Sequence, residues 1–171
     1  MTVAVDAGRV EQAWAALSEV LDPEVPALSV VDLGLVREVL ERGDGLEIVL
    51  TPTYSGCPAT EVIERSVLDA VEAAGLGPAR VTMRRAPAWS SDWISAEGRR
   101  KLLEYGIAPP GPVPADGAVP IRIVGRRQAA VPCPRCGSAR TERLSAFGST
   151  ACKSLHRCLD CREPFEHFKP I

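Results

Sequence analysis

The stretch "TPTYSGCPATEVIERSVLDAV", Thr51 to Val71, joins a short apolar segment to a helix through a Gly-Cys-Pro turn. Proline suits the first helical position, because its missing N–H would be unsatisfied there in any case. The turn therefore predicts a helix from Pro58 to Ala74 with Cys57 as its N-cap. The helix dipole and the free backbone N–H groups would favour the Cys57 thiolate, the form that attacks electrophiles or binds metal. The alternative is a small buried residue at a tight turn.

The segments on either side of this stretch predict an α+β module with a small mixed sheet backed by helices. "LVREVL" and "LEIVLT", joined through Gly-Asp-Gly, indicate a hairpin, and "ARVTMRRAP" indicates a third strand. A strand–helix–strand crossover makes the second and third strands parallel. Cys57 then lies at the carboxyl end of a strand, where open α/β sheets place ligands. Four apolar residues at helical spacing predict a preceding helix: Val10, Trp14, Leu17 and Leu21.

The segment before the proline-rich region, "PAWSSDWISAEGRRKLLEYGIAPP", predicts a short helix that ends at Gly106. It also holds Trp89 and Trp93. We expect both indoles to be packing anchors; the alternative is an exposed pair on a partner surface.

Two Cys-x-x-Cys motifs mark the C-terminal module: Cys133 with Cys136, and Cys158 with Cys161. Four thiolates from two tight turns are typical of a zinc ribbon, and four protein ligands close the site, so the zinc is expected to be structural. A four-thiolate iron–sulfur site and a redox motif are the alternatives. The residues between the motifs suit two short strands that turn near Gly148.

Three further residues of this module are not needed as metal ligands. His156 and His167 are expected to be packing or surface residues, because four thiolates are better ligands. Cys152 is expected to be a small strand residue. As an alternative it is an accessory thiol activated by Lys153, provided that both side chains face solvent.

Charge and proline content divide the chain into an expected domain of residues 1–107, a linker of residues 108–119 and a zinc-ribbon domain of residues 120–171. Residues 1–119 hold 10 Lys and Arg against 18 Asp and Glu, whereas residues 120–171 hold 10 against 4. The first part is therefore acidic and the second basic, which suggests modules with different partners or modules that attract each other. The stretch "APPGPVPADGAV" excludes a helix and a central strand.

No apolar run approaches the roughly 20 residues that span a membrane, and the start of the chain lacks the pattern of a secretory signal. We therefore expect a cytoplasmic protein. Structural disulfides are rare in that compartment, so the six cysteines are better explained as metal ligands or reactive thiols.

The run "LDPEVPALSVVDLGLV" followed by "TPTYSGCPA" resembles the iron–sulfur assembly family once called domain of unknown function 59. The similarity continues through "DWISAEGRRKLLEYGIAPP", "CPRCGS", "FGSTACKSLHRC" and "EPFEHFKP". That full series, over residues 10–171, resembles the PaaD-like family of phenylacetate degradation, whose members accompany the phenylacetyl-CoA epoxidase system.

The resemblance implies a non-catalytic accessory subunit that carries or inserts an Fe–S cluster, or iron, for this ring-epoxidising monooxygenase. Its expected partners are the epoxidase subunits, with the reductase subunit, which carries flavin and a 2Fe–2S cluster, as the favoured client. The resemblance assigns Cys57 as a transient cluster ligand and Asp22 as a nearby proton acceptor or supporting carboxylate. Because one cysteine cannot hold a cluster, a homodimer or the client must complete the ligand set.

Two other functional classes compete with this interpretation. A thiol enzyme would need a general base near Cys57, normally histidine, and the only histidines, His156 and His167, lie in the other module. A nucleic-acid- or protein-binding ribbon adaptor without cluster chemistry is suggested by the basic C-terminal part. Nucleic acid is disfavoured, because the whole chain is mildly acidic and lacks a recognised base-reading motif.

Overall fold

The computed structural model describes residues 7–54, 56, 58–113 and 130–171. The chain divides into two compact units, Met1–Gly98 and Arg99–Ile171, which are described separately. Cys57 and most of the expected linker lie outside the described residues. Within the described ranges, no helix is both long and apolar enough to cross a membrane.

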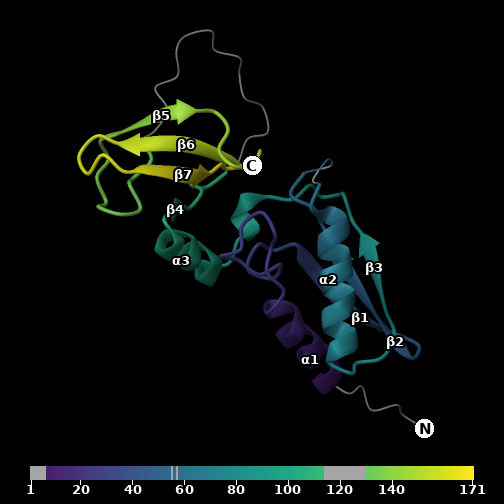
Figure 1. The fold of residues 1–171 in the computed structure, drawn as a ribbon. Coiled ribbons are helices and arrows are strands. Elements are labelled where there is room, and N and C mark those ends of the chain that lie inside the picture. The colour runs from purple at the N-terminus through teal and green to yellow at the C-terminus, as the bar shows by residue number, and fades with distance from the viewer. Residues whose placement is uncertain (1–6, 55, 57, 114–129) are drawn as a thin grey trace. The chain divides into compact units, whose positions relative to one another are not determined.

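The first unit is a three-stranded mixed sheet with two helices (Figure 1). Its strands are β1 (Val36–Arg42), β2 (Gly45–Leu50) and β3 (Ala79–Met83), in the order β1-β2-β3. β1 and β2 pair antiparallel, and β2 and β3 pair parallel. The predicted hairpin, the predicted crossover and the α+β fold class are therefore confirmed.

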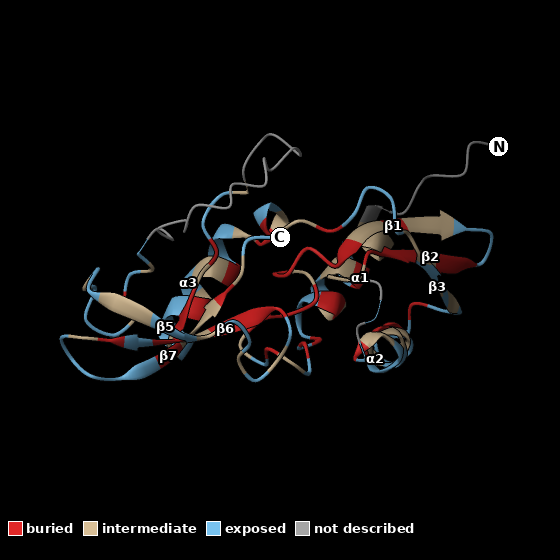
Figure 2. Ribbon diagram, turned by 90° about the horizontal axis from the view of Figure 1, so that it is seen from above, coloured by how far each residue is buried: buried red, intermediate tan, exposed pale blue. Residues whose placement is uncertain are grey.

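The two helices of this unit are α1 (Ala7–Ser18) and α2 (Thr60–Ala73). α1 contacts β1 and α2, while α2 also contacts β3, so the helices cover one face of the sheet. The central strand β2 is buried along most of its length (Figure 2). Ile48, Val49 and Leu50 are all buried, so side chains on both faces of this strand are covered.

The expected helix boundaries were wrong at two places. α1 ends at Ser18, before the predicted stripe reaches Leu21, whose side chain is 56% exposed and whose backbone forms a bridge with Ser29. α2 begins at Thr60 with Ala59 as its N-cap, so Cys57 is not the capping residue. Pro58 and Ala59 form a turn that precedes the helix instead of its first turn. The other end of α2 lies as expected, because Gly75 adopts φ +68° directly after the C-cap.

Beyond β3, a 3₁₀ turn (η1, Ser91–Trp93) leads into α3 (Ala96–Tyr105), which ends at Gly106 as predicted. Trp89 is the expected packing anchor, since it is buried and its indole N–H donates to the carbonyl of Leu33 at 2.9 Å. Trp93 is only half-buried. The guanidinium carbon of Arg37 lies 3.7 Å from its ring centroid, a cation–π contact.

The second unit holds a four-stranded sheet in the order β4-β7-β6-β5. Its strands are β4 (Ile107–Ala108), β5 (Thr141–Ser145), β6 (Lys153–Cys158) and β7 (Pro164–Phe168). β5 and β6 are the two strands expected on either side of Gly148, whereas β4 and β7 were not predicted. β4 pairs parallel to β7, and Ala108 joins Cys133, Cys158 and Phe165 in the core of the unit.

The position of β4 bears on the expected domain boundary between residues 107 and 108. That boundary would divide the two residues of β4, and the compact units separate after Gly98 instead. The physical reason is tertiary: a two-residue strand has no periodicity of its own, and its partner lies far along the chain in β7.

Candidate metal centre and the loop end of the N-terminal sheet

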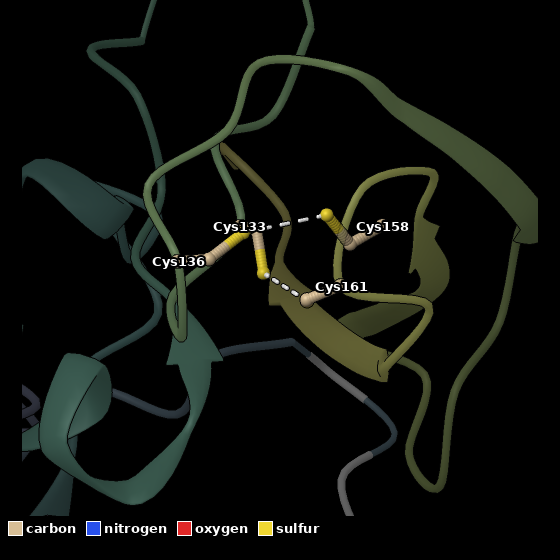
Figure 3. Close-up of side chains that lie close together, drawn as sticks. All are labelled: Cys133, Cys136, Cys158 and Cys161. Carbon is tan, nitrogen blue, oxygen red and sulfur yellow. Dashed lines mark hydrogen bonds between the residues drawn. The ribbon is translucent and has the colours of Figure 1, made fainter.

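The four cysteines of the two Cys-x-x-Cys motifs converge on one point in the second unit (Figure 3). Their sulfur atoms all lie within 4.8 Å of one another. The Sγ atoms of Cys133 and Cys161 are 3.7 Å apart, and those of Cys136 and Cys158 are 3.5 Å apart. A tetrahedral ion with metal–sulfur distances of about 2.3 Å would space its sulfurs about 3.8 Å apart. The donor set therefore fits a four-coordinate metal ion, as predicted from the sequence.

The backbone of each motif turns in the same way. The N–H of Gly137 donates to the carbonyl of Cys133 at 2.9 Å, and Gly137 adopts φ +74°. Arg162 occupies the matching position directly after Cys161 and adopts φ +67°. Positive φ is uncommon for a side chain other than glycine. The turn that presents the second pair of sulfurs therefore imposes this conformation on Arg162.

The surroundings of the sulfur atoms shift the pKa values of Cys158 and Cys161 in opposite directions. The backbone N–H of Cys161 donates to the sulfur of Cys158 and holds the pKa of Cys158 at about 7. The pKa of Cys161 is raised to about 12. The amide of Glu163 opposes that rise, but partial desolvation and the neighbouring sulfurs outweigh it. A cation would stabilise every thiolate in this cluster, because thiols that coordinate a metal lose their protons.

The two histidines lie away from the sulfur cluster, in the packing of the same sheet. His156 is buried, its Nε2 lies 3.0 Å from the Ser154 hydroxyl, and its ring stacks on Phe165. Its ring centroid is 5.5 Å from that of His167. Burial lowers the pKa of His167 to about 4, with a smaller contribution from His156. Both rings therefore act as neutral packing groups near pH 7.

Cys152 and Lys153 do not face solvent together. Cys152 is buried, and its sulfur lies 3.0 Å from the Thr150 hydroxyl. Lys153 is also buried and pairs with Glu166. The condition for an activated accessory thiol is not met, and these contacts favour the expected role of Cys152 as a small packed residue.

Asp22 lies in the loop that follows α1 and shapes a turn there. It is buried, and its Oδ1 accepts the backbone N–H groups of Glu24 at 2.9 Å and Val25 at 2.7 Å. Its own N–H donates to the carbonyl of Leu28 at 2.9 Å. The carboxylate therefore holds backbone amides in a turn.

Backbone hydrogen bonds place the loop that carries Asp22 at the carboxyl end of β2. The backbone N–H of Val30 donates to the carbonyl of Val20 at 2.9 Å. The N–H of Leu35 donates to the carbonyl of Val30 at 3.0 Å, and the N–H of Thr51 donates to the carbonyl of Leu35 at 2.8 Å. α2 begins at this same end of the sheet (Figure 1). The segment from Thr51 towards Cys57 thus leaves the sheet beside this loop. A direct approach of Asp22 to Cys57 stays a prediction, because Cys57 lies outside the described residues.

Thr51 also lies at the carboxyl end of β2, and the sequence analysis did not identify it as a candidate site residue. Its side chain is 1% exposed, and its hydroxyl has no hydrogen-bond partner among the described residues. The sequence offered one unused signal: a hydroxyl directly follows the apolar run of β2, at the first residue of the loop towards Cys57.

Comparison with known proteins covers both units. Residues 10–83 match the family described as iron-sulfur cluster assembly protein, and residues 119–169 match the PaaD zinc beta ribbon domain. The chain is 45% identical over 163 residues to the D component of the "Putative 1,2-phenylacetyl-CoA epoxidase" of Escherichia coli (strain K12), and the match covers 95% of this chain and 94% of that protein.

Among solved structures, a domain of unknown function DUF59 from Bacillus anthracis is 26% identical with a TM-score of 0.51, over 56% of this chain and 92% of that one. A conserved hypothetical protein from Thermotoga maritima is 28% identical with a TM-score of 0.48, over 60% of this chain and 98% of that one. The Bacillus structure supports the α+β fold of the N-terminal unit.

Proposed function

The chain belongs to the PaaD-like family, which joins an iron–sulfur assembly domain to a C-terminal zinc ribbon, and we therefore propose that it is an accessory maturation factor of a phenylacetyl-CoA epoxidase. It carries or inserts an Fe–S cluster, or iron, and performs no turnover of its own. The observation that carries this proposal is the 45% identity to a component of such an epoxidase along nearly the whole chain.

Cys57 is the proposed ligand for this cargo, and Asp22 is the proposed supporting carboxylate. Both residues fall within the part of the chain that matches the iron–sulfur assembly family. The loop of Asp22 and the segment from Thr51 towards Cys57 leave the same end of the sheet, which supports one shared site. A soft thiolate suits iron, and the carboxylate supplies negative charge beside it.

A single thiolate leaves iron coordination incomplete, so a second ligand donor is part of the proposal. The client is an epoxidase subunit, and the reductase subunit is the favoured one. A second copy of this chain is the other donor, which would make the loaded form a homodimer. The size of the loaded protein, measured under anaerobic conditions with and without the client, distinguishes these two sources.

The metal of the ribbon is proposed to be zinc with a structural role. Four cysteine ligands close the coordination shell and leave no position for a substrate. Elemental analysis should give one zinc per chain in the wild type and in Cys152→Ser, because Cys152 is not in the sulfur cluster. Cys136→Ser should lose the metal, while residues 1–98 stay folded. Stoichiometric iron without zinc would contradict the assignment.

The cluster-carrier proposal is tested by anaerobic reconstitution with iron and sulfide. The wild type should take up a labile chromophore and support the activity of an epoxidase matured alongside it. Cys57→Ser should lose both properties and keep its thermal midpoint, since serine lacks the soft sulfur that iron prefers. Cys152→Ser is the matched control and should behave as the wild type. Full activity of Cys57→Ser would refute the role of Cys57.

A further inference from the structure

The four cysteines of the metal centre differ in their exposure. Cys133 and Cys158, the first residues of the two motifs, are buried, whereas Cys136 and Cys161, the second residues, are exposed. Each of the two short sulfur–sulfur contacts joins a buried cysteine of one motif to an exposed cysteine of the other (Figure 3). The two motifs therefore cannot separate without breaking both contacts.

A carboxylate joins the two cysteine loops, residues 133–138 and residues 158–163. Asp160 lies between the two cysteines of the second loop. Its Oδ2 accepts a hydrogen bond from the hydroxyl of Ser138. Its Oδ1 accepts one from the guanidinium of Arg140 at 2.6 Å. The Ser138 hydroxyl in turn accepts the backbone N–H of Arg140 at 3.0 Å. We refer to these three hydrogen bonds as the Asp160 bridge.

Backbone hydrogen bonds tie the Asp160 bridge to the loops that hold the cysteines. The carbonyl of Ser138 accepts the N–H of Cys133 at 2.9 Å, and the carbonyl of Arg140 accepts the N–H of Leu159 at 2.8 Å. The side chains of Arg140 and Asp160 are 72% and 39% exposed, and an exposed ion pair adds little to the stability of a fold. The bridge connects the two halves of the ligand set, so its effect should appear in how the metal is held.

We propose that Asp160 is a positioning residue of the metal centre, and that the Asp160 bridge slows the loss of the ribbon metal by holding the two cysteine loops together. The inference rests on the proposed zinc site. A tetrahedral metal held by two pairs of thiolates leaves only after one pair has dissociated, and the loops must then separate. While the bridge is closed, a dissociated thiolate stays close to the ion at high effective concentration and binds again.

The test is the rate at which the full-length, zinc-loaded protein loses zinc to an excess of a chromogenic chelator. Asp160→Ala should release zinc about three- to tenfold faster than the wild type, because it removes the acceptor for both the hydroxyl and the guanidinium. The circular dichroism spectrum of the loaded variant should match that of the wild type, since the substituted side chain is partly exposed.

Glu142→Gln is the matched control for this measurement. Glu142 pairs with Arg157, and the two side chains are 42% and 45% exposed. That pair joins β5 to β6 and does not connect the two cysteine loops. The variant should therefore release zinc at the wild-type rate. A release as fast as that of Asp160→Ala would show that any lost ion pair in this sheet speeds release, and would overturn the inference.

Two further measurements distinguish the Asp160 bridge from a general loosening of the ribbon. Arg140→Gln should speed release in the wild-type background and have a smaller effect in Asp160→Asn, because the charge that it pairs with is already gone. Added sodium chloride should speed release from the wild type more than from Asp160→Asn, since salt screens an exposed ion pair. Additive effects of the two substitutions, together with equal salt dependence, would contradict the bridge.

The outcomes separate this inference from the proposed zinc site. A wild type that binds one zinc and loses it at the same rate as Asp160→Ala overturns the inference and leaves the zinc site intact. A wild type that neither contains zinc nor takes it up refutes the zinc site itself, and with it this inference.

Discussion

The ammonium of Lys153 lies 2.9 Å from Oε2 of Glu166, and only 4% of the Lys153 side chain is exposed. The other carboxylate oxygen of Glu166 accepts the backbone N–H of Ser149 at 2.5 Å. Burial raises the pKa of Glu166, but the hydrogen bonds from Ser149 and Lys153 outweigh it and hold that pKa below its usual value. The pair joins β6 to β7 and to the turn before β6, so it links three parts of the ribbon.

We predict that Glu166→Gln destabilises the ribbon by about 2–3 kcal/mol, because a buried ammonium then loses its counter-charge. Glu142→Gln is the control. Glu142 pairs with Arg157 across the same sheet, but both side chains are nearly half exposed, and the expected cost is below about 1 kcal/mol. Denaturant unfolding of the metal-loaded protein measures both. Equal losses for the two variants would show that burial of Lys153 does not matter.

The stability of the ribbon should fall as the pH drops from about 6.5 to about 4. Burial lowers the pKa of His167 to about 4 in the folded protein. In the unfolded chain His167 has the ordinary histidine pKa of about 6.5. Between pH 6.5 and pH 4 the unfolded chain therefore binds more protons than the folded protein, so a lower pH favours unfolding. The contribution of His167 should be on the order of 1–2 kcal/mol, since the ring is partly exposed.

The measurement for His167 is the free energy of unfolding at pH 7 and pH 5 for the wild type and His167→Gln, both loaded with metal. Loading matters because the cysteine ligands also respond to acid. The variant should lose less stability than the wild type over this interval. An equal loss of stability in the two proteins would contradict the assignment of His167 as a half-buried, neutral imidazole.

Substitutions at the residues that follow the two Cys-x-x-Cys pairs should have different effects on the stability of the ribbon, because one adds a Cβ and the other removes one. Gly137 and Arg162 both adopt positive φ at the position after a Cys-x-x-Cys pair. Gly137→Ala should cost about 1–2 kcal/mol, because a Cβ is strained in this conformation. Arg162→Gly removes a Cβ from the same conformation, and the gain is partly offset by the freedom of glycine in the unfolded chain. It should therefore be neutral or stabilising, as measured by resistance to metal loss in chelator.

Local patterns predicted the elements that do not depend on distant partners. The hairpin follows from apolar alternation on both sides of Gly-Asp-Gly, and the end of α2 follows from Gly75. The sulfur cluster follows from spacing alone, since each pair comes from one turn. The hairpin, the helix end and each cysteine pair are determined by residues that lie close together in the chain, which is why the sequence suffices.

Features fixed by tertiary contacts could not be predicted in this way. β4 exists because Ile107 and Ala108 meet β7, and no local signal marks that pairing. Leu21 fits a helical stripe by spacing, yet the chain leaves the helix at Ser18 to form a bridge with Ser29. Only the folded surroundings of Thr51 show that its hydroxyl has no hydrogen-bond partner among the described residues.

Two substitutions of Asp22 separate its structural role from its proposed role at the site. Its Oδ1 accepts two backbone N–H groups, those of Glu24 and Val25. Asp22→Asn retains an acceptor in this position and should keep the thermal midpoint close to that of the wild type. Asp22→Ala leaves both amides without that acceptor and should cost about 1–2 kcal/mol.

The same pair of variants tests whether the charge of Asp22 acts on Cys57. A nearby carboxylate opposes formation of a thiolate, and this opposition suits a site that must bind its cargo and then release it. Asp22→Asn removes the charge and keeps the turn, so Cys57 should be alkylated faster near neutral pH, and cluster transfer should fall more than cluster binding. Rates are read by mass spectrometry of Cys57, with buried Cys152 in the same sample as the internal control. If the rate at Cys57 is the same in the wild type and Asp22→Asn, the carboxylate and the thiol are not coupled, and Asp22 serves the turn alone.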